Sequence, residues 1–562
     1  MTPPQREFMD ASSTLHDRQR ALQLLFVASE IYPLAKTGGL ADVCGSLPQE
    51  LARLGVDVHL MLPGYPEALD RVSGVHGEVD LGEVLPGLHA RLVQGRMPGS
   101  GLPVWLVDCP RLYRREGTLY QDPEGRDWDD NALRFALLNH VAARVAAGRT
   151  ALDWKADIVH ANDWHTGMVP LLLAAYGGDR PRSIFTIHNM AFQGLFPLDD
   201  ARGLGLPEKV LGTDYAEFYG KLSFLKAGIA SADMVTTVSP TYAREICTPE
   251  YGFGMEGLLQ ERSGHLLGIL NGIDTRIWDP STDEFLTRHY SSTNLAGKAA
   301  CKADLQRHLG LQVDREAPLA VSLSRLTHQK MADVLLECLP AMLSRHPRLQ
   351  VAVHGCGEHA MEEGLASLAC AFPGRLSVRL GYQEELEHRM HAGADILLHG
   401  SRFEPCGLAQ MYAMHYGTIP VVRHVGGLAD SVIDAGEPPQ RAIGSTGFAF
   451  DQPSGDAMLS ALDRCLDMYH AWPKIWSGMR RLAMAGDFSW ARSAREYVKL
   501  YVALAPRLDD PQVQDAKPAT GRAPHMATAL QGLKVVAGQR AITKVHPEDG
   551  RRAGRSSSGG RS

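Results

Sequence analysis

Two glycine-containing turns, one in each half of the chain, constrain its fold more than any other feature. The first spans residues 36–42, with the sequence KTGGLAD, and the second spans 402–408, with the sequence RFEPCGL. Each turn follows an apolar, strand-like run and precedes a helix-like segment. In an α/β protein, such turns present backbone N–H groups and the start of a helix to an anion. The matched pair predicts a two-domain enzyme that holds a phosphorylated substrate in the cleft between its halves.

Short apolar runs alternate with helix-like stretches along most of the chain, and the alternation restarts after residues 271–280. This rhythm indicates parallel β-α-β units, and the restart indicates two doubly wound domains. Ligands of such sheets bind beyond the carboxyl ends of the strands. We expect strands at 22–28, 56–62, 157–160, 183–187, 234–238 and 266–270, and then at 319–323, 349–353, 376–380, 395–398 and 418–422.

The alternation and the composition at the two ends of the chain predict five segments. From about residue 507 the sequence is rich in Pro, Gly, Ala, Arg and Ser, which is typical of disorder. We predict a polar extension at 1–20, a Rossmann-like domain at 21–272, a second at 273–485, a helix at 486–506 that packs back on the first domain, and a disordered tail at 507–562.

Composition excludes several classes of function. The 562 residues include 57 Lys and Arg against 64 Asp and Glu, a net charge of −7 that argues against general nucleic-acid binding. No apolar run is long enough to span a bilayer, and residues 1–20 lack the apolar core of a secretory signal. The nine cysteines are scattered without a C-x-x-C pair, which indicates reduced thiols of a cytoplasmic protein. No H-E-x-x-H spacing occurs, so we expect no metal site.

Three cations occupy turns that suit a diphosphate. Arg325 and Lys330 follow the predicted strand 319–323, where a planar guanidinium and a point charge together fit a diphosphate. Lys36 stands beside Gly38 and Gly39, which would let the backbone approach a ligand closely. In isolation each cation would more readily be interpreted as a solvated loop charge, but their shared position at strand ends favours binding. Asp42 either orients the first loop or contacts a sugar hydroxyl.

Glu404 precedes a helix that we predict over 406–416. A carboxylate there acts either as a partner of the helix start or as a contact to the donor sugar. Cys406 is interpreted as a small buried apolar residue, because no partner histidine is readable. Gly426 and Gly427 resemble a turn that admits a phosphate to a helix N-terminus.

Polar residues also follow two neighbouring strands of the first half. Asp163 lies within 160–165, with sequence HANDWH, and His188-Asn189 follow the next strand. Because strand ends of one sheet converge, these groups indicate substrate contact. The alternative is that the histidines are hydrogen-bonded structural residues.

These segments, taken in order, resemble bacterial glycogen synthases and plant starch synthases, and the resemblance runs from about residue 22 to 505. It implies a GT-B architecture, in which two Rossmann-like domains face a deep interdomain cleft. It further implies transfer of glucose from ADP-glucose to the non-reducing end of glycogen or another α-1,4-glucan, with retention of configuration. ADP-glucose would be a co-substrate, and neither a cofactor nor a metal would be needed. The segments that carry it are 36–42, 160–165, 188–189, 271–274, 324–330, 381–382, 401–408 and 426–430.

The resemblance also implies roles for single residues. Arg325 and Lys330 would neutralise the diphosphate leaving group, and Glu404 would bind the donor glucose hydroxyls. The backbone carbonyl of His188 would face the developing positive charge. The remaining residues would bind substrate. Lys36 and Gly39 would lie at the diphosphate and acceptor side, Asp163 and Asn189 at the glucose, and Tyr382 beside the adenine. Cys406, Gly407 and Leu408 would contribute backbone contacts, and the other substrate-binding residues would be Gly38, Asp42, Asn271, Gly426 and Gly427.

Two positions depart from the family pattern close to these residues. Met331 stands where the family usually has Gly, and Gly400 stands where a Pro commonly precedes Ser401. Met331 would either narrow the diphosphate side or point away from it. Two rival functions follow: a retaining transferase that uses UDP-glucose, and a glucan-binding paralogue without catalysis. A phosphorylase is disfavoured because no motif for a pyridoxal phosphate lysine is readable.

Overall fold

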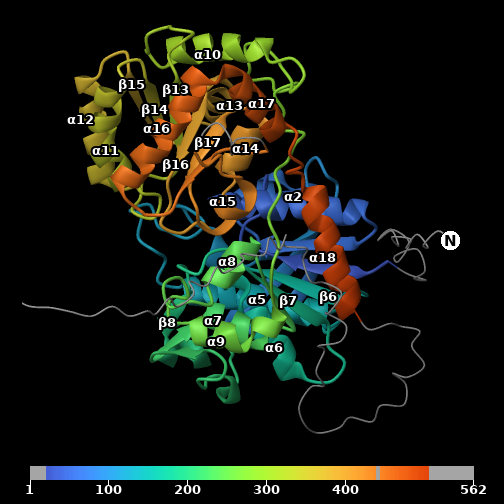
Figure 1. Cartoon of the computed structure of the whole chain (residues 1–562). Coiled ribbons are helices and arrows are strands. Elements are labelled where there is room, and N and C mark those ends of the chain that lie inside the picture. The colour runs from blue at the N-terminus through green and yellow to red at the C-terminus, as the bar shows by residue number, and fades with distance from the viewer. Residues whose placement is uncertain (1–20, 438–443, 506–562) are drawn as a thin grey trace, which may run out of the picture. The chain divides into compact units, whose positions relative to one another are not determined.

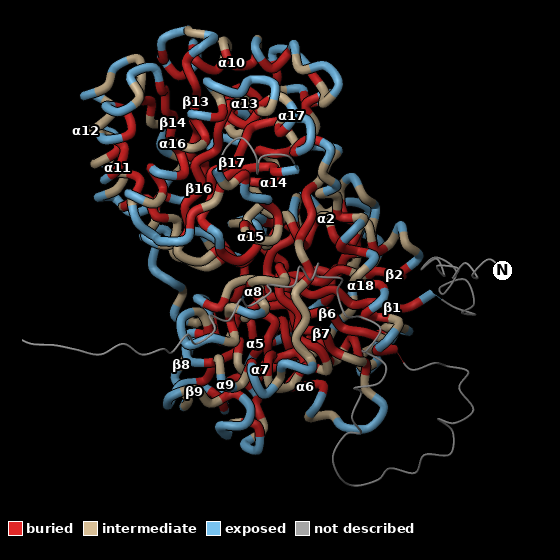
Figure 2. The backbone as a smooth tube through the Cα atoms, in the orientation of Figure 1, coloured by how far each residue is buried: buried red, intermediate tan, exposed pale blue. Residues whose placement is uncertain are grey.

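The computed structural model describes residues 21–437 and 444–505, which contain two large β-sheets, each flanked by helices (Figure 1). The predicted N-terminal extension and C-terminal tail lie outside these residues. The central strands of both sheets are buried between the helices, as Figure 2 shows by their colour. The prediction of two Rossmann-like domains is thereby confirmed, because central parallel strands covered on both faces are the mark of this fold.

The first sheet has nine strands in the order β12-β11-β7-β6-β1-β2-β5-β4-β3. Its strands from β12 to β5 are parallel, and β4 and β3 extend the edge in antiparallel fashion. The bounds are β1 Gln23–Val27, β2 Asp57–Pro63, β3 Ser73–Leu85, β4 Leu88–Arg96, β5 Pro103–Asp108, β6 Ile158–Asn162, β7 Arg182–Ile187, β11 Met234–Thr237 and β12 Leu266–Gly268.

The second sheet has six parallel strands in the order β15-β14-β13-β16-β17-β18. A small antiparallel sheet, β8-β10-β9, follows the loop after β7 in the first half. The bounds are β13 Leu319–Leu323, β14 Gln350–Gly355, β15 Leu376–Leu380, β16 Ile396–His399, β17 Ile419–Arg423 and β18 Phe448–Phe450, with β8 Leu195–Pro197, β9 Glu217–Phe218 and β10 Lys221–Ser223.

Helices connect the strands of both sheets and cover their faces. Those of the first half are α2 Gly39–Arg53, α3 Pro66–Arg71, α4 Pro110–Tyr113, α5 Asn131–Ala146, α6 Met168–Tyr176, α7 Phe224–Ser231, α8 Pro240–Glu245 and α9 Glu256–Glu261. Those that follow are α10 Ala296–His308, α11 Ala332–Arg345, α12 His359–Ala371, α13 Glu384–Gly393, α14 Ala409–His415, α15 Gly426–Ser431, α16 Gly455–Ala471, α17 Pro473–Met484 and α18 Trp490–Leu504.

Sequence patterns missed the buried parallel strand β5, the antiparallel edge of the first sheet, the small sheet and β18. β3 is the clearest case, because most of its residues are at least partly exposed and it lacks the apolar run of a buried strand. The helix predicted over 406–416 also begins later, at Ala409. Gly407 has φ +70°, a left-handed conformation that cannot continue a helix, so residues 406–408 form a loop.

Helix α18 belongs to the core of the first sheet although it follows the second. Trp490, Ala494 and Tyr497 are buried in the same apolar cluster as β1 and β6, and α18 contacts α2. The His160 ring is hydrogen-bonded through Nδ1 to the Tyr501 hydroxyl (2.8 Å) and through Nε2 to Thr186 Oγ1 (2.6 Å). Burial lowers the pKa of His160 to about 3, so the ring is neutral in this network.

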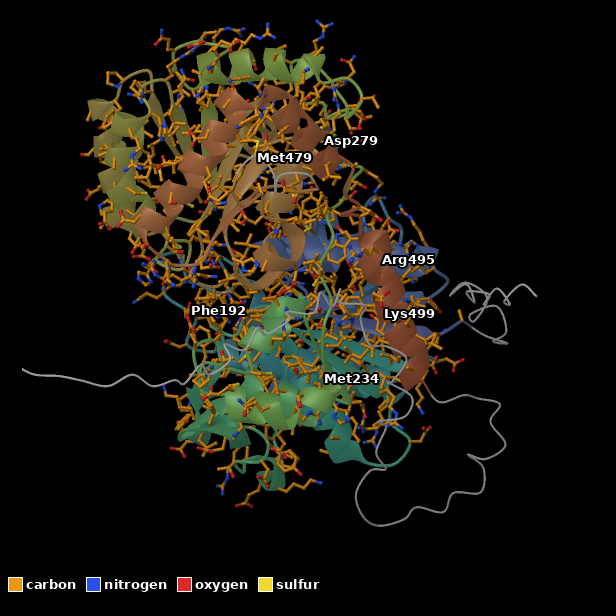
Figure 3. All side chains as sticks on the ribbon, in the orientation of Figure 1. Phe192, Met234, Asp279, Met479, Arg495 and Lys499 are labelled. Atoms are coloured by element: carbon orange, nitrogen blue, oxygen red, sulfur yellow. The ribbon has the colours of Figure 1, made fainter. Side chains whose placement is uncertain are left out.

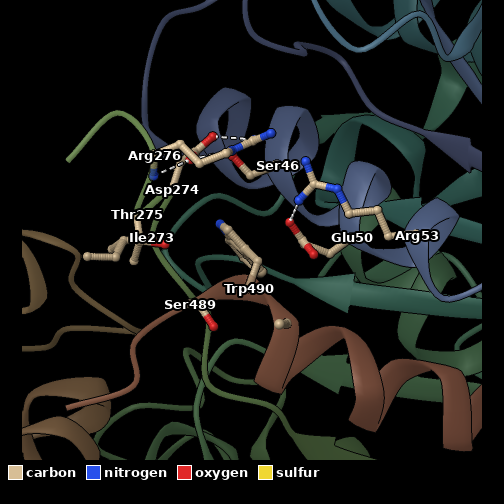
Figure 4. A pocket seen from close by; sticks show the side chains of 10 residues that line it. Ser46, Glu50, Arg53, Ile273, Asp274, Thr275, Arg276, Ser489 and Trp490 are labelled. Carbon is tan, nitrogen blue, oxygen red and sulfur yellow. Dashed lines mark hydrogen bonds and ion pairs between the residues drawn. The ribbon is translucent and has the colours of Figure 1, made fainter. Parts of the chain in front are cut away.

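The two passages of the chain between the sheets lie side by side. Ile273 forms a β-bridge with Ser489, and its N–H donates to the Phe488 carbonyl (2.8 Å). Figure 4 shows a pocket of about 220 Å³ that these passages form with α2. Its two arginines are paired, Arg276 with Asp274 and Arg53 with Glu50. This pocket therefore offers no unpaired cation to an anionic ligand.

We predict that Tyr501→Phe lowers the free energy of unfolding by about 1–2 kcal/mol, because it leaves the buried His160 Nδ1 without its partner. Urea denaturation measures the change. The same substitution at Tyr215, which is 41% exposed, should leave stability unchanged. Equal stability of the Tyr501→Phe variant and the parent would contradict this account of the α18 contact.

Candidate active site

Glu404 and Lys330 form a buried ion pair at the carboxyl ends of β16 and β13. Glu404 Oε2 is paired with Lys330 Nζ and lies 3.3 Å from His399 Nε2. Burial of the carboxylate opposes its ionisation, but Lys330 and His399 together hold the pKa of Glu404 below its ordinary value. Glu404 is therefore an ionised carboxylate in a largely solvent-free position, with its remaining acceptor capacity available to a ligand.

Backbone hydrogen bonds fix the loops that carry this pair. The Arg402 N–H donates to the Gln329 carbonyl (2.8 Å), and the Gln329 side chain donates to the Phe403 carbonyl (3.2 Å). The Arg402 guanidinium binds both carboxylate oxygens of Asp333 in α11, each at 2.8 Å. A bidentate pair of this kind fixes orientation as well as distance. The position of Lys330 opposite Glu404 is thus set by residues adjacent to both.

The Arg325 side chain lies on the same loop as Lys330 but is exposed. Within the described residues its guanidinium makes no hydrogen bond or ion pair, so its five donors are available to an anion. Lys330 differs, because its charge already has a partner.

Met331 and Gly400, which sequence analysis singled out, lie against each other. Met331 has φ +55°, a left-handed conformation, and its side chain is fully buried in the core of the second sheet. A Cβ atom on Gly400 would lie 3.3 Å from both Cβ and Sδ of Met331, and 2.7 Å from Cε of Met458. Met331 therefore fills space beneath the Glu404 loop that the missing side chain at 400 leaves open.

The Lys36 loop is held by two carboxylates. Lys36 Nζ is paired with Asp42 Oδ1 (2.8 Å), so Asp42 orients this loop in the structure. The N–H groups of Thr37 and Gly38 donate to the Glu30 carboxylate, at 3.3 Å for Gly38. Burial raises the pKa of Glu30 to about 7 despite these two bonds. Sequence analysis missed Glu30, although it follows the first strand and precedes Lys36 by only six residues.

The first loop also reaches residues of the second sheet. Lys36 Nζ lies 5.9 Å from the centre of the Tyr382 ring, which is 58% exposed. A Cβ atom on Gly39 would lie 3.9 Å from Leu408 Cδ1. That distance is an ordinary van der Waals contact, so α2 lies close to the loop before α14 at this point. The structure thus brings together Lys36, Gly39, Tyr382 and Leu408, which are far apart in sequence.

Asp163 and His188 meet at the ends of β6 and β7. The Asp163 carboxylate accepts hydrogen bonds from the backbone N–H groups of Trp164 (3.0 Å) and His188. Burial raises its pKa to about 7, and its backbone has φ 60° and ψ 175°, a strained combination for a side-chain-bearing residue. Burial lowers the pKa of His188 to about 3, and the neutral ring is bonded to Asn162 Oδ1 (3.1 Å). The neighbouring Asn189 side chain accepts from the Ala191 N–H (3.0 Å).

Gly426 and Gly427 allow the start of α15 to pack closely against the backbone of the Glu404 loop. A Cβ atom on Gly426 would lie 1.8 Å from the Glu404 carbonyl oxygen, and one on Gly427 would lie 2.1 Å from the Cys406 carbonyl oxygen. The Gly426 N–H donates to Glu245 Oε1 (3.0 Å), and the Gly427 N–H donates to the Glu404 carbonyl (3.1 Å). These donors, which sequence analysis assigned to a phosphate, are already bound to protein oxygens here.

Cys406 and Asn271 lie beside the same loop. Cys406 is 5% exposed, and burial raises the pKa of its thiol to about 12, so it stays protonated as a small apolar side chain. Asn271 is 7% exposed, and its N–H donates to the Val238 carbonyl (3.3 Å). Among the described residues no group of three His, Cys, Asp or Glu side chains could hold a metal ion.

Two family models match the chain: the starch synthase catalytic domain over residues 23–261 and glycosyl transferases group 1 over 310–474. The chain is 57% identical over 505 residues to a glycogen synthase of Burkholderia thailandensis, covering 90% of this chain and 94% of that one. A glycogen synthase of Thioalkalivibrio sulfidiphilus is 47% identical over 481 residues, with 85% and 99% covered. The chain belongs to the glycogen synthase family.

Solved structures agree with this family. The catalytic domain of Arabidopsis thaliana starch synthase IV, bound to ADP and acarbose, superposes with a TM-score of 0.76 at 31% identity and covers 87% of this chain and 100% of that one. A sucrose-phosphate synthase of Thermosynechococcus elongatus shares the fold, with a TM-score of 0.53 at 17% identity over 86% and 99% of the chains. The glycogen synthase relatives and the starch synthase match make this chain a glucosyltransferase of GT-B architecture.

His399, Glu30 and Glu245 are site residues that sequence analysis did not single out. His399 ends β16 and Glu30 follows β1, so their places at strand ends were a readable signal. Glu245 lies at the end of α8 and reaches Gly426 only through the tertiary fold, and no local pattern indicates that contact. None of the helices within the described ranges is long and apolar enough to cross a membrane.

We predict that Gly400→Ala destabilises this member of the glycogen synthase family by about 1–3 kcal/mol, because the added methyl group meets Met331 and Met458 in a packed core. In a variant that already carries Met331→Gly, the same change should cost less. The double-mutant cycle, measured by urea denaturation, reports the coupling directly. Additive effects would contradict the contact between positions 331 and 400.

We predict that Glu30 makes the free energy of unfolding fall as pH rises from about 4.5 to 7. A carboxyl whose folded pKa exceeds its unfolded value binds more protons in the folded state across that window, so stability is lost there. Glu30→Gln should remove about 1–3 kcal/mol of this pH dependence. Asp179→Asn, at a side chain that is 92% exposed, is the control and should leave the profile unchanged. Identical profiles for Glu30→Gln and the parent would refute the assignment.

Proposed function

We propose that this chain transfers glucose from ADP-glucose to the non-reducing end of glycogen or another α-1,4-glucan, with retention of configuration. The observation that carries the proposal is the buried Glu404–Lys330 pair, with Arg325 unpaired on the same loop. The glycogen synthase relatives support the reaction, and the starch synthase structure with ADP and acarbose supports the classes of donor and acceptor.

The cations of the second domain suit the leaving group of this reaction. As the bond between the sugar and the diphosphate breaks, negative charge develops on the phosphate oxygen. Lys330 is a fixed donor that stabilises this charge without reorganisation of solvent, and the unpaired guanidinium of Arg325 supplies further donors. Lys330 is held against Glu404 before any ligand arrives, so its ammonium group is already positioned when the diphosphate binds.

Glu404 and His188 suit the sugar. The ionised Glu404 carboxylate accepts hydrogen bonds from donor glucose hydroxyls and so orients the ring. The anomeric carbon gains positive charge in the transition state, as in glycoside hydrolysis, and the backbone carbonyl of His188 turns the negative end of a dipole toward it. Asp163 holds that segment in place through the His188 N–H. Its strained backbone is consistent with a position selected for this purpose.

Tyr382 is proposed to flank the adenine, because its ring is exposed beside Lys36. No cofactor or metal takes part in the proposed reaction. All nine cysteines are free, which supports a reducing, cytoplasmic location. Glycogen is the proposed partner, and the proposal includes neither nucleic acid nor a membrane.

The test is incorporation of labelled glucose into glycogen from ADP-glucose or UDP-glucose, in the presence of a chelator. We expect incorporation from ADP-glucose, and a fall in kcat of about 100- to 1000-fold in Lys330→Ala, because a developing diphosphate charge loses its fixed partner. Lys474→Ala, at an exposed lysine of α17, is the matched control and should keep full activity.

Three outcomes contradict parts of the proposal. A preference for UDP-glucose keeps the mechanism and replaces the donor. A Lys330→Ala variant with the kcat of the parent removes the diphosphate role of Lys330. Binding of glycogen without transfer from either donor supports a non-catalytic glucan-binding protein instead.

A further inference from the structure

Backbone strain marks two exposed aromatic residues near the site. Among the described residues, four that are not glycine have positive φ: Asp163, Tyr219, Phe253 and Met331. Asp163 and Met331 lie beside the groups discussed above. Tyr219 has φ 49° and is 83% exposed, and Phe253 has φ 51° and is 40% exposed. A left-handed backbone costs a bulky residue energy, and neither ring recovers that cost through full burial.

These two rings belong to a set of neighbouring aromatic residues that starts at the Glu404 loop. The Phe253 ring centre lies 5.4 Å from that of Phe403, which directly precedes Glu404 in the sequence. A Cβ atom on Gly254, the residue after Phe253, would lie 3.6 Å from Cε2 of Tyr219. We call Phe403, Phe253 and Tyr219 the aromatic row. It therefore extends from the Glu404 loop to the small β8-β10-β9 sheet.

Local contacts hold the row in place. The Gln193 side chain donates to the Phe253 carbonyl (3.0 Å), and Ser223 Oγ at the end of β10 donates to the Gln193 carbonyl (3.0 Å). The Tyr219 ring packs against Phe218 of β9, with ring centres 4.7 Å apart. Contacts with the small sheet and with the loop after β7 therefore hold the exposed rings in place. Phe192 on that loop is also exposed and is labelled in Figure 3.

A surface depression continues the row beyond Tyr219. It has a volume of about 500 Å³, which is within the usual range for ligand sites. Gly220, the residue after Tyr219, is part of its wall. The lining residues are Leu195, Phe196, Pro197, Leu198, Asp199, Gly220 and Lys221. The wall combines apolar side chains with one acid and one base, which suits a neutral ligand that has both C–H faces and hydroxyl groups.

We propose that the aromatic row and this depression form a platform for the acceptor α-1,4-glucan chain. The C–H groups on the faces of successive glucose units would pack on the electron-rich faces of Phe253 and Tyr219, while hydroxyl groups at the rim reach Asp199 and Lys221. A glucan is the occupant because the row begins beside Glu404, where the growing end of the acceptor must lie. The platform rests on the proposed function for the identity of its ligand.

The platform is tested by Tyr219→Asn and Phe253→Asn. Asn tolerates positive φ, so each change removes the ring while keeping the backbone conformation. We expect the KM for glycogen to rise about three- to tenfold, the effect of losing one ring contact. The KM for ADP-glucose, measured in the same assay, should change less than twofold.

Further variants separate the platform from a general structural effect. Tyr219→Phe keeps the ring and should keep the KM of the parent for glycogen. Val313→Asn alters a 52% exposed apolar side chain of the second half and should leave both KM values unchanged. With maltose as acceptor, which offers far fewer glucose units for contact than glycogen, Tyr219→Asn should raise KM less than it does with glycogen.

A binding measurement keeps this test independent of the proposed reaction. Electrophoresis through gels that contain glycogen gives a dissociation constant without turnover. Weaker binding of both Asn variants than of the parent supports the platform even if no donor is used. Parent-like binding and parent-like KM for glycogen in both variants would overturn the platform while leaving the transferase proposal intact.

Discussion

The buried ion pair between Glu404 and Lys330 is the interaction on which the arrangement of the site depends. A carboxylate at this depth is tolerated only with a compensating charge, and removing one partner of such a pair is costly. The pair requires the loops after β13 and β16 to keep a fixed separation. Arg402, Gln329 and Asp333 hold that separation through hydrogen bonds, and Gly426 and Gly427 allow α15 to approach the same loop from the other side. The loops around Glu404 are therefore arranged mainly to keep its buried charge paired with Lys330.

The strained residues of the described chain follow the same logic. Met331 adopts a left-handed backbone next to Lys330, and Asp163 adopts an extended one with positive φ next to the His188 segment. Positions of this kind persist only where surrounding contacts over-determine them. For Met331 the compensation is visible, because its side chain is buried against Gly400 beneath the Glu404 loop. Met331 and Gly400 thus form one packed contact.

Sequence reasoning predicted the parallel strands of both sheets within a few residues, except β5 and β18, because a strand buried on both faces leaves a continuous apolar run. It missed β3, β4 and the small β8-β10-β9 sheet, whose strands are partly exposed or very short. For His160 in the segment 160–165, sequence reasoning left open substrate contact or a hydrogen-bonded structural role, and the structure places its ring in the core under α18. Successive residues of a strand point to opposite faces of the sheet, and the local sequence does not show which face a later helix will cover.

By itself the sequence determined the two doubly wound domains, the order of their strands along the chain and the turns where charged residues gather. These follow from local periodicity and from glycine, which are properties of neighbouring residues. Tertiary structure alone decided which of the charges are paired. Glu404 meets Lys330 and His399, Gly426 meets Glu245, and Phe253 meets Phe403. Such contacts join residues of different elements, and burial at those points sets both pKa values and exposure, which no local pattern encodes.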